Sequence, residues 1–148
     1  MDNVDKEILV QLQEDARLSM TELGKRVGLS QPAVTERVRR LEEQGVIEQY
    51  RTVLSGEKIG KPTTAFILFS TLQCTEFVEF CRQNPRVVEC HRVTGEACYL
   101  IKIAVESNRE IEIFENEAMP YGHFKTLISL SSPVLHKALV PAESRIRA

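Results

Sequence analysis

The sequence predicts an α+β protein of two parts, an N-terminal winged helix-turn-helix followed by a C-terminal ferredoxin-like βαββαβ domain. Two short amphipathic helical patterns joined by Gly28, Leu29 and Ser30 predict the first part. From Thr63 onward the pattern changes to alternating strands and helices, which predicts the second part. Residues 55–62, between the two, contain two glycines, a proline and several charges, so we expect a linker there.

Three helices and a short wing are expected in the first domain, residues 1–54. The first helix should span residues 2–15. Ser19, with Glu22 three residues later, has the pattern of a capping box at the start of the second helix. Residues 46–54 should form a short strand pair or wing. The apolar residues at helical spacing, which we expect to face inward, are Ile8, Leu9, Leu12, Leu23, Val27, Val34, Val38 and Leu41.

The third helix, which closes on Gly45, bears most directly on function. Ser30 is its predicted N-cap, and Pro32 is tolerated in its first turn. Because its apolar stripe faces inward, Gln, Thr, Glu and Arg side chains face solvent. A second helix with such residues at its exposed start is typical of a helix-turn-helix that binds DNA. The alternative is a helical hairpin with a solvated charged face.

Different roles on DNA are expected along this helix. A recognition helix enters the major groove with its N-terminus first, so the residues from 31 to 36 should lie nearest the base edges. The three arginines that follow can hold phosphates, or Arg39 or Arg40 can contact a base. Alternatively, these two arginines pair with glutamates of the same helix. The candidate DNA-binding residues are Ser30, Gln31, Pro32, Thr35, Glu36, Arg37, Arg39 and Arg40.

Two segments carry a resemblance to a known family. The segment from Leu29 to Tyr50 has the pattern LSxxxVxxRVxxLExxGVIxxY, which resembles the DNA-binding half of the Lrp/AsnC (feast/famine) family of prokaryotic transcription regulators. VTGEACYLIKI, from Val93 to Ile103, resembles the glycine turn in the ligand-sensing domain of that family. The resemblance spans about residues 4–140. It implies a homodimer that assembles further to an octamer, and a small-molecule effector that is often an amino acid.

The second domain, residues 63–148, should have the order βαββαβ. Its expected elements are strands at 63–72, 87–93, 97–105 and 123–131, and helices at 75–84 and 108–119. Ser107 and Glu110 have the pattern of another capping box. Residues 134–140 form an apolar tail. Two helices can cover only one face of such a sheet, so the other face needs a partner, which the resemblance implies is a second copy of the chain.

The turn at Thr94, Gly95 and Glu96 has a structural and a functional interpretation. Structurally, Gly95 allows the positive φ of a hairpin turn. By the resemblance, the turn helps to form an effector pocket between dimers, where backbone N–H groups bind a carboxylate. The family commonly has an acidic residue before Tyr99, whereas this chain has Cys98, so one partner for an ammonium group is missing. The candidate effector-binding residues are Thr94, Gly95, Glu96, Cys98, Tyr99 and Thr126, the last of which can equally be a cross-strand hydroxyl.

Composition and charge exclude several classes of protein. The 148 residues have a formal net charge of −2, which excludes a histone-like polycation. DNA binding depends on local charge, and a basic patch is expected from Lys25, Arg26, Arg37, Arg39, Arg40 and Arg51. The sequence has no apolar run long enough to cross a membrane, and its N-terminus is too acidic for a signal peptide. We therefore expect a cytoplasmic protein, and the resemblance implies that it is prokaryotic and nucleoid-associated.

The cysteines and histidines predict no chemistry. The four cysteines lack C-x-x-C spacing, so no metal site is expected, and Cys81 and Cys90 are interpreted as small core residues. The three histidines have no Ser or Cys partner at a recognised spacing, and no phosphate-binding glycine loop is present. We therefore expect no catalytic residues, no cofactor and no enzyme activity.

The sequence thus predicts a sequence-specific DNA-binding transcriptional regulator that binds double-stranded DNA and responds to an amino acid or a related metabolite. A first alternative is a nucleoid-type architectural protein that wraps DNA without a specific effector. A second is a stand-alone ligand-binding or enzyme-like domain whose helical half no longer binds DNA.

Overall fold

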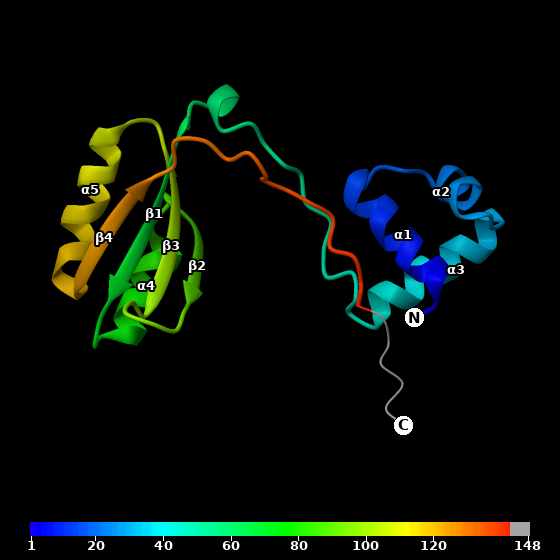
Figure 1. Cartoon of the computed structure of the whole chain (residues 1–148), viewed down its shortest axis with the longest axis horizontal. Helices are drawn as coiled ribbons and strands as arrows, with labels where there is room; N and C mark the ends of the chain where they lie inside the picture. Colours follow the sequence, from blue (N-terminus) through cyan, green and yellow to red (C-terminus); the bar gives the residue numbers. More distant parts are fainter. Residues whose placement is uncertain (143–148) are drawn as a thin grey trace. The chain divides into compact units, whose positions relative to one another are not determined.

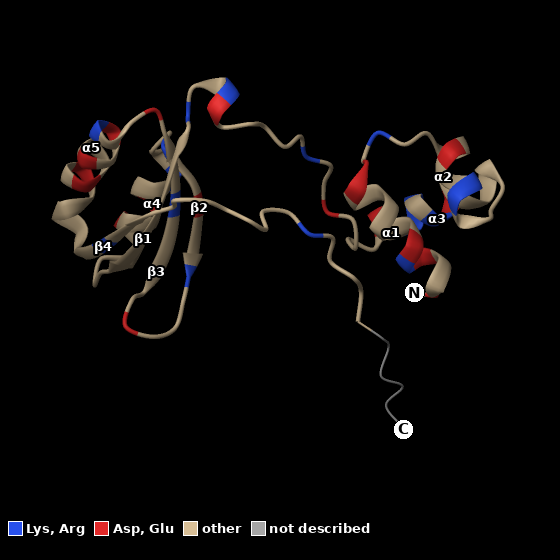
Figure 2. Ribbon diagram, turned by 45° about the horizontal axis from the view of Figure 1, so that its top comes forward, with Lys and Arg blue, Asp and Glu red and all other residues tan. Residues whose placement is uncertain are grey.

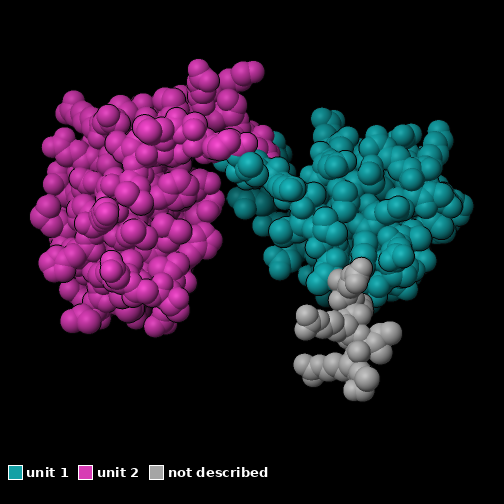
Figure 3. Space-filling model, viewed as in Figure 1, with its two compact units in different colours: residues 1–52, 134–148 teal, residues 53–133 magenta. Residues whose placement is uncertain are grey.

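The computed structural model describes residues 1–142 and divides them into two compact units (Figure 3). The first contains residues 1–52 and the tail from Val134, and the second contains residues 53–133. The sequence placed this tail in the second domain, whereas its contacts group it with the first. The side-chain amide of Gln13 donates to the Leu139 carbonyl at 3.0 Å and accepts from the Leu139 N–H at 2.8 Å.

Three helices form the first unit: α1 (Asn3–Glu14), α2 (Met20–Val27) and α3 (Gln31–Glu43) (Figure 1). A capping box that the sequence analysis missed begins α1, because Asp2 and Asp5 each accept the other's backbone N–H, at 2.9 and 3.0 Å. Only one of the two hydrogen bonds of the capping box predicted for α2 is present. Ser19 accepts from the Glu22 N–H at 3.1 Å, while the Glu22 carboxylate pairs with Arg26 at 3.5 Å.

The three helices share one apolar core. The eight predicted inward-facing residues are all buried in it, so the prediction from helical spacing is confirmed: Ile8, Leu9, Leu12, Leu23, Val27, Val34, Val38 and Leu41. Gly28 ends α2 with a φ of +69°, a left-handed conformation that glycine adopts without strain. The turn packs closely on α2, since a Cβ at Gly24 would lie 2.7 Å from the Leu29 carbonyl oxygen.

Residues 46–54 contain no strand, so the strand pair expected there is not formed. The chain continues from Gly45 as irregular backbone as far as a short 3₁₀ turn, η1 (Glu57–Ile59). Val46, Tyr50 and Val53 are exposed along this segment. Its β-branched and aromatic residues are typical of a strand, but a strand also needs a neighbour to accept its backbone hydrogen bonds.

The second unit has the predicted ferredoxin-like βαββαβ order. Its elements are β1 (Thr63–Ser70), α4 (Cys74–Gln83), β2 (Val87–Arg92), β3 (Tyr99–Val105), α5 (Asn108–Ala118), a 3₁₀ turn η2 (Met119–Tyr121) and β4 (His123–Ile128). The four strands form one antiparallel sheet in the order β2-β3-β1-β4 (Figure 1). None of the helices in residues 1–142 is long and apolar enough to span a membrane.

Helices α4 and α5 both cover the same face of this sheet. Alternate residues of β1 and β3 are buried beneath them, among them Ile67, Phe69 and Ile101. Phe77 of α4 stacks on Phe69, with ring centroids 3.8 Å apart. The residues of the opposite parity lie on the face that carries no helix: Thr64, Phe66, Leu68, Leu100, Lys102 and Ala104 are all half-buried.

Three details of the second unit differ from the expectations. The strand predicted over 123–131 ends at Ile128. Ser107 occupies the N-cap position of α5 but makes no side-chain capping bond. The Glu110 carboxylate instead accepts the backbone N–H of Glu106, at 3.0 Å.

The two cysteines assigned to the core have different surroundings. Cys81 on α4 is buried, as predicted, and burial raises the pKa of its thiol to about 12. Cys90 is exposed, so its assignment to the core was wrong; it lies on β2, which is an edge strand and is exposed along most of its length. Residues 1–142 contain no group of three His, Cys, Asp or Glu side chains that could hold a metal ion.

Candidate nucleic-acid interface and effector turn

The exposed start of α3 presents the residues predicted to lie nearest DNA bases, namely Gln31, Pro32, Thr35 and Glu36. Thr35 donates its hydroxyl to the Gln31 carbonyl at 2.8 Å, so its methyl group is the part available to a partner. Ser30 is the N-cap residue but makes no side-chain capping bond, which corrects the predicted cap. An N-cap side chain can accept a hydrogen bond from the backbone N–H of the second or third helical residue. Pro32 occupies the second position and has no N–H, so only one of these donors is present.

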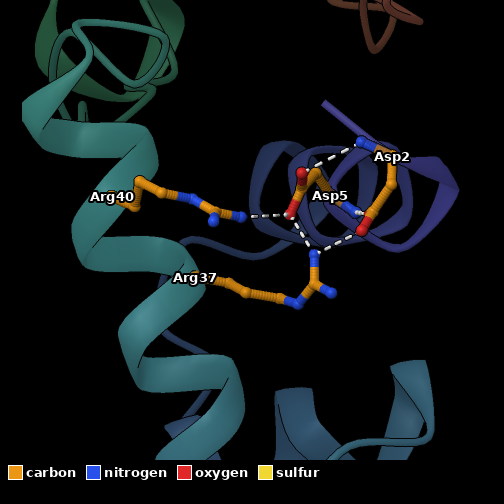
Figure 4. Close-up of polar contacts among 4 residues, drawn as sticks. All are labelled: Asp2, Asp5, Arg37 and Arg40. Carbon is orange, nitrogen blue, oxygen red and sulfur yellow. Dashed lines mark hydrogen bonds and ion pairs between the residues drawn. The ribbon is translucent and has the colours of Figure 1, made fainter.

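Arg37 is directed toward α1. Its Nη1 donates to Asp2 Oδ2 and to Asp5 Oδ1, each at 2.7 Å (Figure 4). The Asp5 side chain is only 4% exposed, and Arg40 also approaches it, at 3.7 Å. The backbone N–H of Asp5, and then the Arg37 guanidinium, lower the pKa of Asp2. This cluster ties α3 to α1, a role for Arg37 that the sequence analysis did not foresee.

Arg39 is paired with two glutamates of its own helix. Its Nε and Nη2 donate to the two carboxylate oxygens of Glu36 at 3.0 and 2.6 Å, and its Nη1 donates to Glu43. The intrahelical pair that the sequence left open as an alternative is therefore present in the free chain. The hydrogen bond from Arg39 lowers the pKa of Glu36. All three side chains remain more than half exposed.

Tyr50 contacts α3 from the segment that follows it. Its hydroxyl donates to Glu42 at 2.7 Å. Partial burial, and then this hydrogen bond, raise the pKa of Tyr50 to about 12. Tyr50 was noted only as part of the resemblance, and its spacing of eight residues from Glu42 gave no signal of a contact.

Other cations of the first unit have no carboxylate partner within residues 1–142. These are Lys6, Arg17, Lys25, Arg51 and Lys137. Lys25 is exposed near the end of α2, the helix that precedes the recognition helix in a helix-turn-helix. Figure 2 shows that basic and acidic residues both occur on the helices of this unit. The expected basic patch is therefore interleaved with carboxylates.

The turn between β2 and β3 is exposed and is fixed at its base. Gly95 has a φ of +118°, as expected from the glycine in this turn. The Val93 N–H donates to the Cys98 carbonyl, and the Cys98 N–H donates to the Phe69 carbonyl, both at 2.9 Å. Ser70 donates its hydroxyl to the Glu96 carbonyl at 3.1 Å, so the turn is also tied to the end of β1.

A pocket beside this turn includes two of the candidate effector residues, Glu96 and Cys98. Its other walls are residues 70–73 and the segment 119–123. The Cys98 thiol lies 3.8 Å from the Thr71 carbonyl. Gly122 was not predicted to matter, yet a Cβ there would lie 2.2 Å from the Ser70 carbonyl oxygen. Its place directly after a Pro-Tyr pair was the only signal in the sequence.

The other candidate effector residues do not line this pocket. Thr94 and Gly95 are in the turn but outside the lining. Tyr99 is 5% exposed and packs against Phe77, with ring centroids 5.5 Å apart. Thr126 pairs with Ile67, on the helix-covered face, and donates to Glu115 of α5 at 2.6 Å. Thr126 thus has the cross-strand position of the structural alternative, but its hydroxyl bonds to a helix and not across the sheet.

Both parts of the chain match family models. Residues 1–48 match a winged helix-turn-helix DNA-binding family, and residues 64–139 match the Lrp/AsnC ligand-binding domain. The chain belongs to the Lrp/AsnC family. This Lrp/AsnC chain is therefore a DNA-binding transcriptional regulator and not an enzyme, as the sequence predicted.

Individual relatives agree over most of their length. The uncharacterized HTH-type transcriptional regulator YezC of Bacillus subtilis is 44% identical over 93% of this chain and 99% of its own. The solved structure of B. subtilis LrpC is 36% identical, with a TM-score of 0.88 over 92% of this chain and 99% of LrpC. A transcriptional regulator from Neisseria meningitidis, solved as a complex with L-Met, is 28% identical, with a TM-score of 0.89 over 94% of this chain and 96% of its own.

Proposed function

We propose that this regulator binds double-stranded DNA sequence-specifically through the exposed start of α3, and that an amino acid or related metabolite modulates this binding. The observation that carries the proposal is the division of α3 into a fully inward apolar stripe and an outward face of Gln, Thr and Arg. Such a face can contact base edges, because Gln pairs with adenine and a Thr methyl packs on a thymine methyl. Ser30 lies where helix N–H groups can meet a phosphate.

The arginines of α3 divide between two roles in this proposal. Arg39 and Arg40 are about half exposed and are the candidates for base or phosphate contacts. Arg37 positions α3 against α1, since its guanidinium binds the carboxylates at the start of α1. Lys25 of α2 adds a phosphate contact, which positions the protein without selecting sequence.

The binding test compares Arg39→Ala and Arg40→Ala with the unchanged chain. Each variant should lose about 1–3 kcal/mol of binding to a specific site if the arginine contacts a base, and should flatten the salt dependence by about one unit if it contacts a phosphate. Both arginines lie outside the buried stripe, so folding should survive. A double variant with unchanged affinity and salt dependence would show that α3 is not the recognition helix.

The alternative function, an architectural protein that wraps DNA, uses the same surface with little preference for sequence. A regulator should keep a large ratio of specific to non-specific affinity, whereas an architectural protein should lose most of its binding to competitor DNA. Genomic footprinting of the bound protein, with and without a panel of amino acids, separates the two and also identifies target sites.

The proposed effector site is the 94–98 turn with its adjoining pocket. A relative is solved with L-Met, and backbone N–H groups at such a turn can bind a carboxylate. Because Cys98 takes the place of an acidic residue, Cys98→Asp should raise the affinity for free amino acids by supplying a partner for the ammonium group. Calorimetry of both proteins against the twenty amino acids tests this. Absence of binding by either protein would contradict the proposed site.

We further propose a homodimer formed by the uncovered face of the sheet, with dimers assembling to an octamer in the bacterial cytoplasm, close to the nucleoid. A dimer with a two-fold axis carries two copies of α3, so its half-sites should be pseudo-palindromic and separated by whole helical turns. Phe66, Leu68 and Leu100 support this proposal, because they form an apolar area with no helix over it.

A further inference from the structure

The charges of α3 balance, although this helix is proposed to approach phosphates. Residues Gln31–Glu43 contain three arginines and three glutamates, so their formal charge is zero. Arg37 binds Asp2 and Asp5 and contributes no free charge. The remaining arginines, Arg39 and Arg40, therefore share the surface with at least as many carboxylates.

Arg39 is the more fully paired of these two. All three nitrogens of its guanidinium donate to carboxylates, two to Glu36 and one to Glu43. The two glutamates lie one turn before and one turn after it, so they hold the guanidinium along the helix surface. The side chains of Arg39, Glu36 and Glu43 are 55%, 63% and 57% exposed. DNA can therefore reach the group without unfolding any part of the core.

We propose that Glu36 and Glu43 are autoinhibitory residues that hold Arg39 in the free protein and so lower its affinity for DNA until a contact with DNA replaces theirs. The inference rests on the proposed role of α3 as the recognition helix.

The physical argument compares what Arg39 gains on two kinds of DNA. On a non-specific duplex it gains one phosphate contact and loses two carboxylate contacts, while the glutamates are brought into the negative potential of the backbone. On a specific site it can gain a bidentate contact to guanine, which is stronger and directional. Because exposed ion pairs are weak, the specific contact can displace them, whereas the non-specific one gains little.

The test is Glu43→Gln in the full chain. Binding is measured to two duplexes of equal length, one with the best sequence selected in vitro by the unchanged protein and one with random sequence. Affinity for the selected duplex should rise by roughly two- to fivefold, the size expected for an exposed ion pair, and affinity for the random duplex should rise by no more than that. The salt dependence on random DNA should become steeper, because Arg39 is free to replace a counterion. Glu36→Gln should have the same effects.

Glu14→Gln is the matched control, because it makes the same charge change at an exposed position of α1. It should leave both affinities unchanged. If the glutamates act through Arg39, Glu43→Gln should have no effect when combined with Arg39→Ala. An effect that persists in that background, or one that Glu14→Gln reproduces, would show general charge repulsion and would overturn the inference. Thermal unfolding of each variant checks that the fold is retained.

The same measurements distinguish a failure of this inference from a failure of the proposed role of α3 in binding DNA. If Arg39→Ala and Arg40→Ala leave both duplexes bound as before, the recognition helix itself is misassigned. If those two variants weaken binding but Glu43→Gln and Glu36→Gln leave both affinities unchanged, α3 keeps its role and only the role of the two glutamates is rejected.

Discussion

Asp5 is a carboxylate that the fold buries, and the charges around it compensate for the loss of water. Its side chain caps α1 and accepts from Arg37 at 2.7 Å. Burying a carboxylate without such partners would be costly. The same contact fixes the third helix against the first, so a residue of α1 sets the position of the helix that is proposed to bind DNA.

Asp5→Ala should therefore destabilise the first unit by about 1–3 kcal/mol, because it removes a charge-assisted hydrogen bond and half of a capping box. DNA affinity should fall with it, while the salt dependence stays the same, since no phosphate contact is lost. Chemical denaturation and salt titration of DNA binding measure the two effects. Glu7→Ala, exposed on the same helix, is the control and should change neither.

Asp2 makes the stability of this cluster depend on pH. Its pKa is lowered from an ordinary value of 3.8, so the folded state favours the charged carboxylate. The stabilisation is present above pH 3.8 and is lost as the pH falls through the lowered value. The melting temperature of the chain should therefore fall as the pH is lowered through that range. Asp2→Asn should show a weaker dependence there; an identical dependence would remove Asp2 from this role.

How much of the site the sequence could predict depends on the distance along the chain between partners. Arg39 and its glutamates are three and four residues apart, so helical spacing alone suggested the pairing. Arg37 lies 35 and 32 residues from Asp2 and Asp5, and no spacing rule connects them. The cluster needs the packing of α1 against α3, which only the folded core specifies.

At the scale of elements, periodicity predicted each helix and sheet strand of the described chain but not every boundary. The inward stripe of α3 and the alternation of β3 each leave a direct pattern in the sequence. Residues 46–54 contain residue types that are typical of a strand, but they have no neighbouring strand to pair with. The tail from Val134 carried apolar residues, but nothing in them indicated that Gln13 would bind it.

The connection from α5 to β4 depends on a close approach of two backbone segments. Gly122 packs against the end of β1, where an added Cβ would meet the Ser70 carbonyl oxygen at 2.2 Å. Gly122→Ala should destabilise the second unit by about 1–3 kcal/mol, since backbone must shift to admit the methyl group. Denaturant unfolding measures this loss. Gly45→Ala is a useful comparison, because its Cβ meets nothing within 4 Å and only the φ of +68° opposes it. Equal denaturation midpoints for Gly122→Ala and the unchanged chain would show that the segment adjusts freely.

At the scale of the whole molecule, the sheet of the second unit has one face covered by α4 and α5 and one face without a helix. Leu68 of β1 lies across from Leu100 of β3 on that uncovered face, and Phe66 lies across from Leu127 of β4. Lys102 and Lys125 are interspersed with them. Apolar surface of this kind gains free energy when a partner removes it from water.

Leu68→Asp should therefore reduce the assembly, because it places a charge at the centre of the proposed dimer interface, where no partner for it would be available. Sedimentation at micromolar concentration should show a dimer or an octamer for the unchanged chain and a smaller species for the variant. Ile113→Asp is the control, since this exposed residue of α5 lies away from the uncovered face. If the unchanged chain sediments as a monomer, the uncovered face is not a dimer interface. If Leu68→Asp and Ile113→Asp both retain the full assembly, contacts elsewhere on the molecule hold the copies together.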